Sequence, residues 1–390
     1  MAGGRGSRLS PFTDYLPKPM FQVGEKPFLE HQIIQAKEFG FRKVLILAGY
    51  LGETISNYFQ INDQFDIDIK VLVSDESLST KLRLLSAINE LDTYFCLVYG
   101  DNLIQLLPFE INSFFTNVNN ELKFIAYQGK GYHSVRNIIV DHKGNFLNYI
   151  NTNDSENPTS MLNLGWYLLS KTIVSNFMID NTGLENELFN RNSKTKITVF
   201  RTFNKYYSVG NLNRLASLER FLDPRRRVVL LDRDGTINVK APKGEYVVNE
   251  RDFIWKKGVK EVLTQFELKN KEFYILTNQP AVGRNLATKE QVDILHTKLY
   301  ENFLKSHLNL KGIVTCYHGW YDGCTCRKPG LGLFLELQET FDLNWKNTVY
   351  IGDDERDYEA AYALGLPFIH VTEHYSDLEA DLSEWVKKFE

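Results

Sequence analysis

Apolar and polar positions along this chain are grouped in blocks rather than alternating residue by residue. Short apolar runs that end in small or acidic residues are separated by amphipathic stretches. In chain order the runs read KVLILAGY, IKVLVSD, YFCLVYGD, RVVLLDRD, EFYILTNQ and TVYIGDD. Such runs are typical of buried parallel strands, and the stretches between them of connecting helices. The pattern predicts an α/β fold with doubly wound sheets.

A domain boundary is predicted in the charged segment ERFLDPRRR. Pro224 blocks continuation of a helix there, and a new buried strand, Val228 to Leu231, begins at once. The predicted domains are residues 1–222 and 225–390. A chain of 390 residues with 43% hydrophobic content has enough apolar material for these two cores.

Charge and hydropathy exclude several classes of partner. The formal net charge is -4 with both signs interspersed, which gives no electrostatic footprint for a nucleic acid. The amino terminus lacks the apolar segment of a signal peptide, and no run approaches the length that spans a bilayer. We therefore expect a cytoplasmic protein that binds neither nucleic acid nor membrane. The sequence leaves the oligomeric state open.

Three apolar runs of the second predicted domain end at chemically useful residues, namely Asp232, Thr277 and Asp353. The carboxyl ends of parallel strands open on one crevice, where Asp232 and Asp234 can serve as nucleophile and proton donor. Asp232, Asp234 and Asp353 would repel one another without a cation, so we expect a bound Mg²⁺. Lys328 supplies a positive charge for a phosphate, which Thr277 and nearby amides can bind.

Three of the four cysteines lie near one histidine. The segment reads Cys316-x-His318, then five residues, then Cys324-x-Cys326. In a cytosolic chain such a cluster indicates metal ligation before disulfides. Three thiolates and one imidazole form the ligand set of a closed, structural Zn²⁺ site, which has no open position for chemistry. We expect the zinc to fix the loop that leads to Lys328.

The runs DRDGTIN, TNQ, RKPG and IGDD, in that order, resemble the four motifs of the haloacid-dehalogenase phosphatases. The resemblance covers the second domain and implies a magnesium-dependent phosphatase that works through an aspartyl-phosphate. The implied roles are nucleophile for Asp232, general acid/base for Asp234, phosphate ligands for Thr277, Asn278 and Lys328, and magnesium ligand for Asp353, with Asp232 and Asp234 beside it. Asp357 is expected to support the site indirectly.

The zinc loop followed by RKPG resembles two subfamilies, the D-glycero-D-manno-heptose 1,7-bisphosphate phosphatases and the histidinol-phosphate phosphatases. GEYVVNERDFIWKKGVKEVL and TNQPAVGRNLATKEQV resemble the heptose branch. Pro280, Ala281 and Asn285 depart from its pattern, which leaves the exact sugar and its anomer open. Arg284 and Arg327 are expected either to contact a second phosphate or sugar hydroxyls, where a guanidinium suits an oxyanion, or to be surface residues.

The segment AGGRGSRLSPFTDYLPKPM resembles the opening of the sugar-1-phosphate nucleotidyltransferases, and KPFLEHQI, VYGDN, NLGWYLLS and YYSVGN follow in that family's order. The resemblance covers about residues 1–222 and implies a Rossmann-like domain with a glycine-rich loop for nucleotide phosphates. The implied nucleotide-binding residues are Gly3, Gly4, Gly6, Arg8, Lys18 and Asp101.

Departures from that family argue against full activity of the first domain. Ser208 stands where the family's second metal-binding aspartate is expected, and SDESLSTKLRLL replaces a glycine-rich sugar and base loop. The family's Glu-Lys pair is replaced near Asn151 and Thr152. The family's first strand would precede the glycine loop, whereas this chain begins at Met1, so we expect either a truncated sequence or a loosely held loop.

Three functions follow from these resemblances. The first is a phosphatase for the 7-phosphate of the heptose bisphosphate, in nucleotide-heptose synthesis for surface polysaccharide, with a degenerate nucleotidyltransferase domain. The second is a bifunctional enzyme that also transfers a nucleotide, from GTP, to heptose 1-phosphate or mannose 1-phosphate. The third is a histidinol-phosphate phosphatase. We prefer the first because Ser208 and the lost glycines weaken the second.

Overall fold

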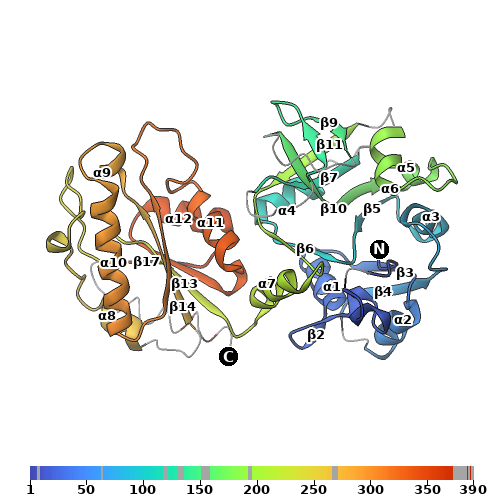
Figure 1. Ribbon diagram of the computed structural model, residues 1–390, viewed down its shortest axis with the longest axis horizontal. Helices are drawn as coiled ribbons and strands as arrows, with labels where there is room; N and C mark the ends of the chain where they lie inside the picture. The colour runs from blue at the N-terminus through green and yellow to red at the C-terminus, as the bar shows by residue number, and fades with distance from the viewer. Residues whose placement is uncertain are drawn as a thin grey trace. The chain divides into compact units, whose positions relative to one another are not determined.

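The structure is a computed structural model that describes residues 1–6, 9–62, 65–116, 122–129, 136–150, 159–191, 196–265, 271–371, 384 and 387. Its contacts divide the chain into two compact units, Met1–Leu222 and Asp223–Glu390 (Figure 1). No helix in the described ranges is both long and apolar enough to cross a membrane.

The second unit is built on a five-stranded sheet in which all paired strands are parallel, in the order β15-β14-β13-β16-β17. The strands are β13 (Arg227–Leu231), β14 (Lys271–Asn278), β15 (Leu310–Cys316), β16 (Thr348–Gly352) and β17 (Phe368–His370). The first strand of the unit, β13, is central because it pairs with β14 on one edge and β16 on the other. The strand order therefore reverses at β13, and ligands bind at such reversal points in open parallel sheets.

Helices cover both faces of this sheet. Helix α10 (Lys289–Lys305) lies on one face, and α11 (Gly332–Phe341) and α12 (Glu355–Leu364) lie on the other (Figure 1). The shorter helices are α8 (Val259–Gln265) and α9 (Pro280–Gly283). Side chains of β13, β14, β16 and α10 form the core, in which Leu231, Ile275 and Val349 are at most 1% exposed. This burial on both faces explains the continuous apolar runs in the sequence.

The first unit contains a mixed sheet in the order β11-β7-β10-β8-β9, with β5 also paired to β10. The long strand β10 runs antiparallel to β5, β7 and β8, whereas β11 and β7 are parallel. The strands are β5 (Tyr94–Val98), β7 (Leu122–Tyr127), β8 (Ile138–Val140), β9 (Phe146–Tyr149), β10 (Ser160–Ser170) and β11 (Ile197–Thr202). Apolar runs alone could not reveal the antiparallel direction of β10.

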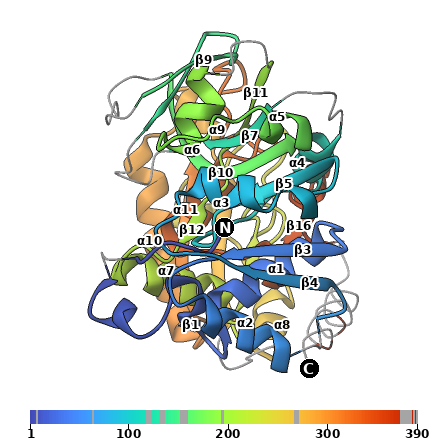
Figure 2. The same cartoon turned by 90° about the vertical axis from the view of Figure 1, so that its right-hand side faces the viewer.

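Three two-stranded sheets accompany the mixed sheet in the part of the first unit that the structure describes. Strands β3 (Lys43–Ala48) and β4 (Asp68–Val73) are parallel and lie side by side (Figure 2). Antiparallel pairs form between β6 (Asn102–Ile104) and β12 (Tyr206–Ser208) and between β1 (Gln22–Val23) and β2 (Lys26–Pro27). The α-helices are α1 (Phe28–Glu38), α2 (Gly52–Ile61), α3 (Thr80–Ser86), α4 (Pro108–Phe115), α5 (Lys171–Ser175), α6 (Leu184–Asn186) and α7 (Leu212–Leu222).

The first residues of the chain lie against the carboxyl ends of two strands. The backbone NH of Ala2 donates to the Leu47 carbonyl at 2.8 Å, and Ala2 forms a parallel bridge with Ala48 of β3. The Met1 amino group donates to the carbonyl of Val98, the last residue of β5, at 2.8 Å. These contacts place Gly3 and the loop that follows it beside the carboxyl end of β3.

Candidate active site

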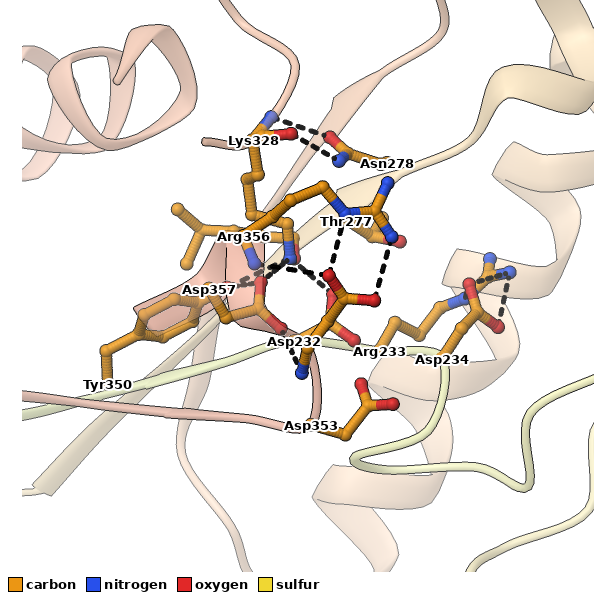
Figure 3. A network of polar contacts seen from close by, with 12 residues as sticks. Asp232, Arg233, Asp234, Thr277, Asn278, Lys328, Tyr350, Asp353, Arg356 and Asp357 are labelled. Atoms are coloured by element: carbon orange, nitrogen blue, oxygen red, sulfur yellow. Dashed lines mark hydrogen bonds and ion pairs between the residues drawn. The ribbon is translucent and has the colours of Figure 1, made fainter. Parts of the chain in front are cut away.

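Asp232 directly follows β13, at the strand where the sheet order reverses. Its backbone NH donates to the Ile351 carbonyl of β16 at 2.9 Å, which extends the sheet by one residue. Thr277 and Asn278 end the neighbouring strand β14, and Asp353 directly follows β16. The parallel strands thus bring the sequence-predicted residues to one end of the sheet (Figure 3).

Lys328 lies between two buried carboxylates. Its ammonium group forms ion pairs with Asp232 and, at 2.8 Å, with Asp357, and the lysine side chain is only 3% exposed. The same ammonium lies 2.9 Å from the Tyr350 hydroxyl, which donates to Asp357 at 2.6 Å (Figure 3). Burial opposes the ammonium charge, but Asp232 and Asp357 outweigh it, so the pKa of Lys328 is raised. Lys328 is therefore a fixed positive charge beside Asp232.

Burial also disfavours the charged form of Asp232, the candidate nucleophile. It raises the pKa of the Asp232 carboxyl to about 7, although the positive charge of Lys328 lowers it in part. The carboxylates of Asp357 and Asp234 raise it further. The positive charge of Lys328 therefore does not fully offset the effects of burial and of the neighbouring carboxylates on Asp232. A bound cation would favour the ionised form of Asp232.

Asp234 is held apart from this cluster by its own set of donors. Arg233 donates to both oxygens of Asp234, from Nε at 3.1 Å and from Nη2 at 3.0 Å. Asn238 and Gln279 each add one amide hydrogen bond to Asp234, at 3.0 and 2.7 Å. The Arg233 side chain is fully buried and also contacts His296 of α10 at 3.2 Å. Asp234 is accordingly fixed in one orientation at the edge of the cavity.

Three carboxylates form a candidate cation site. Oxygen atoms of Asp232, Asp353 and Asp357 lie within 4.8 Å of one another. Oδ1 of Asp353 is buried and has no hydrogen-bond partner, which is the behaviour expected of an oxygen reserved for a cation. Its other oxygen accepts from Lys240 at 2.8 Å. The oxygen donors fit Mg²⁺. The structure places the Asp234 side chain outside this group, although the sequence predicted it there.

Thr277 and Asn278 are differently engaged. The Thr277 side chain is 1% exposed, and its hydroxyl accepts from Gln279 at 2.8 Å. Asn278 forms a reciprocal pair with the backbone of Lys328, accepting from its NH at 3.1 Å and donating to its carbonyl at 3.3 Å. Asn278 therefore ties β14 to the loop that carries Lys328.

These groups open on a cavity of about 390 Å³. The residues that line it include Asp232, Lys240, Tyr246, Trp320, Arg327 and Arg356. Arg284, which the sequence placed near the substrate together with Arg327, does not line this cavity. The lining combines carboxylates with cationic side chains, of which Lys240 and Lys328 pair with those carboxylates, and with the aromatic rings of Tyr246 and Trp320.

The four predicted metal ligands converge at the end of β15. Cys316 Sγ lies 3.7 Å from Cys324 Sγ and 3.3 Å from Cys326 Sγ. His318 Nδ1 lies 3.6 Å from Cys316 Sγ and 3.2 Å from Cys326 Sγ. A tetrahedral zinc ion with bonds of about 2.3 Å to sulfur requires sulfur atoms about 3.8 Å apart. The observed spacing fits that requirement, and the loop leads directly to Lys328.

In the first unit, the structure brings two of the predicted nucleotide-binding residues together. Lys18 forms a 2.6 Å ion pair with Asp101. The backbone NH of Val209 donates to the Asp101 carbonyl at 3.1 Å, so the adjoining Ser208 lies near Asp101. The hydroxyl of Ser208 accepts from Arg214 at 3.1 Å. A guanidinium, rather than a second carboxylate, therefore neighbours this position.

The glycine-rich loop of the first unit is only partly described. Gly3, Gly4 and Gly6 are described, and Gly6 has a φ of +64°, which favours glycine. Arg8, Asn151 and Thr152 lie outside the described residues. The structure therefore gives no position for Arg8 among the predicted nucleotide ligands.

A side chain fills the space beside Gly3. A Cβ atom on Gly3 would lie 1.6 Å from Nη1 of Arg83, and one on Gly49 would lie 1.9 Å from it. The guanidinium thus lies against both glycines, and its Nη2 donates to the carbonyls of Asp75 and Leu78 at 3.0 Å each. Arg83 is 2% exposed, and its Nε and Nη1 are buried without hydrogen-bond partners.

Comparison with known proteins identifies the second unit. A family model described as polynucleotide kinase 3 phosphatase matches residues 227–376. The D-glycero-alpha-D-manno-heptose-1,7-bisphosphate 7-phosphatase of Campylobacter jejuni is 32% identical over 136 residues, which is 35% of this chain and 76% of that protein. The chain belongs to the heptose-1,7-bisphosphate 7-phosphatase family. It is accordingly a phosphoric monoester hydrolase.

A further relative of this heptose phosphatase family has a different anomer in its name. The D-glycero-beta-D-manno-heptose-1,7-bisphosphate 7-phosphatase of Rhodopseudomonas palustris is 31% identical over 151 residues, covering 37% of this chain and 82% of that protein. The family resemblance inferred from the motifs of the second domain is confirmed.

The first unit has a separate match. A family model described as nucleotidyl transferase matches residues 1–128, which confirms the nucleotidyltransferase-like fold. A solved structure of HddC from Yersinia pseudotuberculosis, complexed with GMP-PN, covers 56% of this chain and 95% of its own, with 20% identity and a TM-score of 0.48. The chain therefore joins a heptose phosphatase family unit to a nucleotidyltransferase-like unit.

Several residues of the phosphatase site were not found from the sequence. Arg233 lies between the two aspartates of the DRDGT run, where the motif assigns it no role. Gln279 is the last residue of the TNQ run, and the motif assigns it no role either. Tyr350 lies two residues before the end of its apolar run and reads as core. Each of them acts through a hydrogen bond to another element, which a one-dimensional pattern does not show.

Proposed function

We propose that the second unit removes the 7-phosphate of D-glycero-D-manno-heptose 1,7-bisphosphate, with bound Mg²⁺ and through an aspartyl-phosphate on Asp232. The observation that best supports this proposal is the pairing of Asp232 with a fully enclosed Lys328 at the point where the strand order reverses. The names of the curated relatives support the heptose substrate over histidinol phosphate.

In the proposed mechanism, each chemical step is assigned to one residue. An oxygen of Asp232 attacks phosphorus, and the bond from phosphorus to the sugar oxygen breaks. The Asp234 carboxyl group gives its proton to the leaving oxygen and afterwards takes one from the water that hydrolyses the acyl phosphate. Lys328 neutralises charge on the phosphoryl oxygens throughout. Arg233 and Gln279 hold Asp234 in the orientation that proton transfer needs.

The carboxylates of Asp232, Asp353 and Asp357 would hold the Mg²⁺ ion. When bound, it neutralises the carboxylates and the phosphate so that like charges can approach. Gly235 allows the chain to pass this point, because a Cβ atom there would lie 2.2 Å from an Asp353 oxygen.

The cysteine and histidine cluster is proposed to hold a structural Zn²⁺ ion. The ligand set Cys316, His318, Cys324 and Cys326 supports this assignment, because all four donor atoms lie within 4.8 Å of one another. With four protein ligands there is no open position for chemistry. The ion would fix the loop that presents Arg327 and Lys328.

Phosphorus NMR on the purified full chain tests the phosphatase. The alpha and beta anomers of the heptose bisphosphate are supplied separately with Mg²⁺, and histidinol phosphate serves as the competing substrate. The proposal predicts loss of the 7-phosphate signal with retention of the 1-phosphate signal. Faster hydrolysis of histidinol phosphate, or release of the 1-phosphate, would contradict it.

A second activity is supported by the first unit, whose boundary we place at residues 1–222, with the phosphatase at 225–390. The Lys18–Asp101 pair supports binding of an NTP near Gly3 to Gly6, followed by transfer to a sugar 1-phosphate. The serine at position 208 counts against efficient transfer, because it adds no charge to a metal site. The same NMR measurement, with GTP and a sugar 1-phosphate supplied directly, resolves this question. An NDP-sugar formed at a useful rate, and lost in Asp101→Ala but not Asp232→Asn, would establish the bifunctional enzyme.

A further inference from the structure

Two aromatic side chains line the phosphatase cavity on the side away from the carboxylates. Tyr246 comes from the segment after β13, and Trp320 from the loop between the metal ligands His318 and Cys324. Trp320 is 55% exposed, so part of its surface is accessible to a ligand in the cavity. Its neighbour Tyr321 is 96% exposed and does not line the cavity.

Arg284 joins these two rings. Its guanidinium carbon lies 4.6 Å from the centroid of Trp320 and 5.8 Å from that of Tyr246, and its Nη1 donates to the Tyr246 hydroxyl at 2.5 Å. Both distances are within the range of cation–π attraction. Arg284 ends the short helix α9, so three separate segments meet through this one side chain.

The cavity lining separates the roles of the two arginines that the sequence treated alike. Arg327 lines the cavity, and its Nη1 is buried without a hydrogen-bond partner, so it is free to bind an oxyanion. Arg284 does not line the cavity, and its guanidinium group contacts the two rings instead. Among the described residues, no carboxylate pairs with either arginine. Arg284 is therefore placed to hold the two rings in position. Arg327 is placed to bind an oxyanion of the substrate.

We propose that Tyr246 and Trp320, held together by Arg284, form a wall on which the sugar of the substrate packs, directing its second phosphate to Arg327. An aromatic face suits the C–H surface of a sugar, while the Tyr246 edge remains polar. Tyr246 and Trp320 are thus specificity-determining residues for sugar phosphates, and Arg284 is a positioning residue. This inference rests on the proposed phosphatase function.

The test compares a sugar substrate with one that has no ring. The values of kcat/KM for the heptose bisphosphate and for acetyl phosphate are measured for wild type, Trp320→Ala, Trp320→Phe and Arg284→Ala. Trp320→Ala should lower kcat/KM for the sugar about tenfold and leave that for acetyl phosphate within about twofold, because only the sugar meets the wall. Trp320→Phe should recover most of the loss. Tyr321→Ala is the matched control and should change neither value.

A positioning role for Arg284 has its own signature. Arg284→Ala should reproduce the loss of Trp320→Ala, and the double variant should lose no more than about twofold beyond either single variant, because both remove the same wall. Arg284→Lys keeps the charge but not the planar stacking group, so it should behave like Arg284→Ala. Losses in Arg284→Ala that multiply with those in Trp320→Ala, or that Arg284→Lys restores, would assign Arg284 to direct phosphate binding and overturn the proposal.

Other results also decide the matter. Equal losses of Trp320→Ala on both substrates, with zinc content unchanged, would overturn a wall specific for sugars, and so would no loss on either. If the wild type does not hydrolyse the heptose bisphosphate, the proposed function fails, and the same ratio is then measured with whichever hexose or heptose phosphate the wild type hydrolyses fastest. A wall for sugar rings predicts the tenfold loss on that substrate too, so the two failures are distinct.

Discussion

Lys328 and Asp357 form an ion pair of 2.8 Å in which the side chains are 3% and 2% exposed. The pair connects the phosphate-binding loop to the first turn of α12, and the Tyr350 hydroxyl donates to the same carboxylate. A buried pair of this kind stabilises the fold little in net terms, but the loss of one partner is costly. Asp357 therefore fixes where the Lys328 ammonium lies relative to Asp232.

Asp357→Asn should lower kcat about 10- to 100-fold, as is usual when a group that orients a catalytic or metal-binding side chain is changed. The amide keeps the shape but removes a charge that faces Lys328. The measurement is phosphate release at saturating substrate and Mg²⁺. Glu359→Gln, an exposed change of the same kind on α12, is the control and should have no effect. Activity within about twofold of wild type would show that neither Lys328 nor the proposed cation site depends on the Asp357 charge.

Asp232→Asn should abolish phosphate release with little loss of fold, because it removes the nucleophile and keeps the shape of the side chain. Turnover and thermal unfolding are measured on the same preparation, since Lys328 still retains Asp357 as a partner. Residual turnover within about tenfold of wild type would exclude Asp232 as the site of the covalent intermediate.

Cys324→Ser should lose bound zinc and lower the unfolding temperature by more than about 5 °C, because metal binding at a structural site contributes directly to folding. Activity should fall as well, since the loop that carries Lys328 is no longer fixed. Metal analysis of protein purified without chelator measures the zinc, with about one ion per chain expected in the wild type. Cys96→Ser in the first unit is the matched control. A wild-type protein without zinc would refute the assignment.

Residues at strand ends were predictable because their position is a property of the sequence itself. Asp232, Thr277 and Asp353 each end an apolar run, and parallel strands of one sheet bring their carboxyl ends together whatever the details of packing. Lys328 was predictable from its motif. The convergence of the three cysteines and His318 was predictable because four rare side chains lie within eleven residues, and local spacing alone brings them close.

The orientations of the side chains were harder to predict from the sequence. Asp234 was predicted beside the cation with Asp232, but the structure turns its carboxylate to Arg233, an adjacent residue that is fully buried only because α10 and the Val247 carbonyl enclose it. Arg284 was predicted either to contact the substrate or to be a surface residue, and its contact with Trp320 depends on the loop between His318 and Cys324. The contacts that fix Arg233 and Arg284 join segments far apart in the chain, so no periodicity or spacing encodes them.

The last prediction concerns nucleotide binding by the first unit, where Arg83 occupies the space beside Gly3 and Gly49. A base or phosphate that approached the Gly3 backbone closely would have to displace this guanidinium. Displacement is not prohibitive, because two of the buried nitrogen atoms of Arg83 have no acceptor and would gain hydrogen bonds in water. The nucleotide still has to move this side chain in the wild type, so Arg83→Ala should tighten binding of GTP about tenfold. Isothermal titration of the full chain with each NTP in the presence of Mg²⁺ measures the effect, and Arg42→Ala, a change of charge elsewhere in the unit, is the control.

Wild type that binds GTP more tightly than Arg83→Ala would show instead that Arg83 contacts the nucleotide, and the loop would then be a working binding site despite its lost glycines.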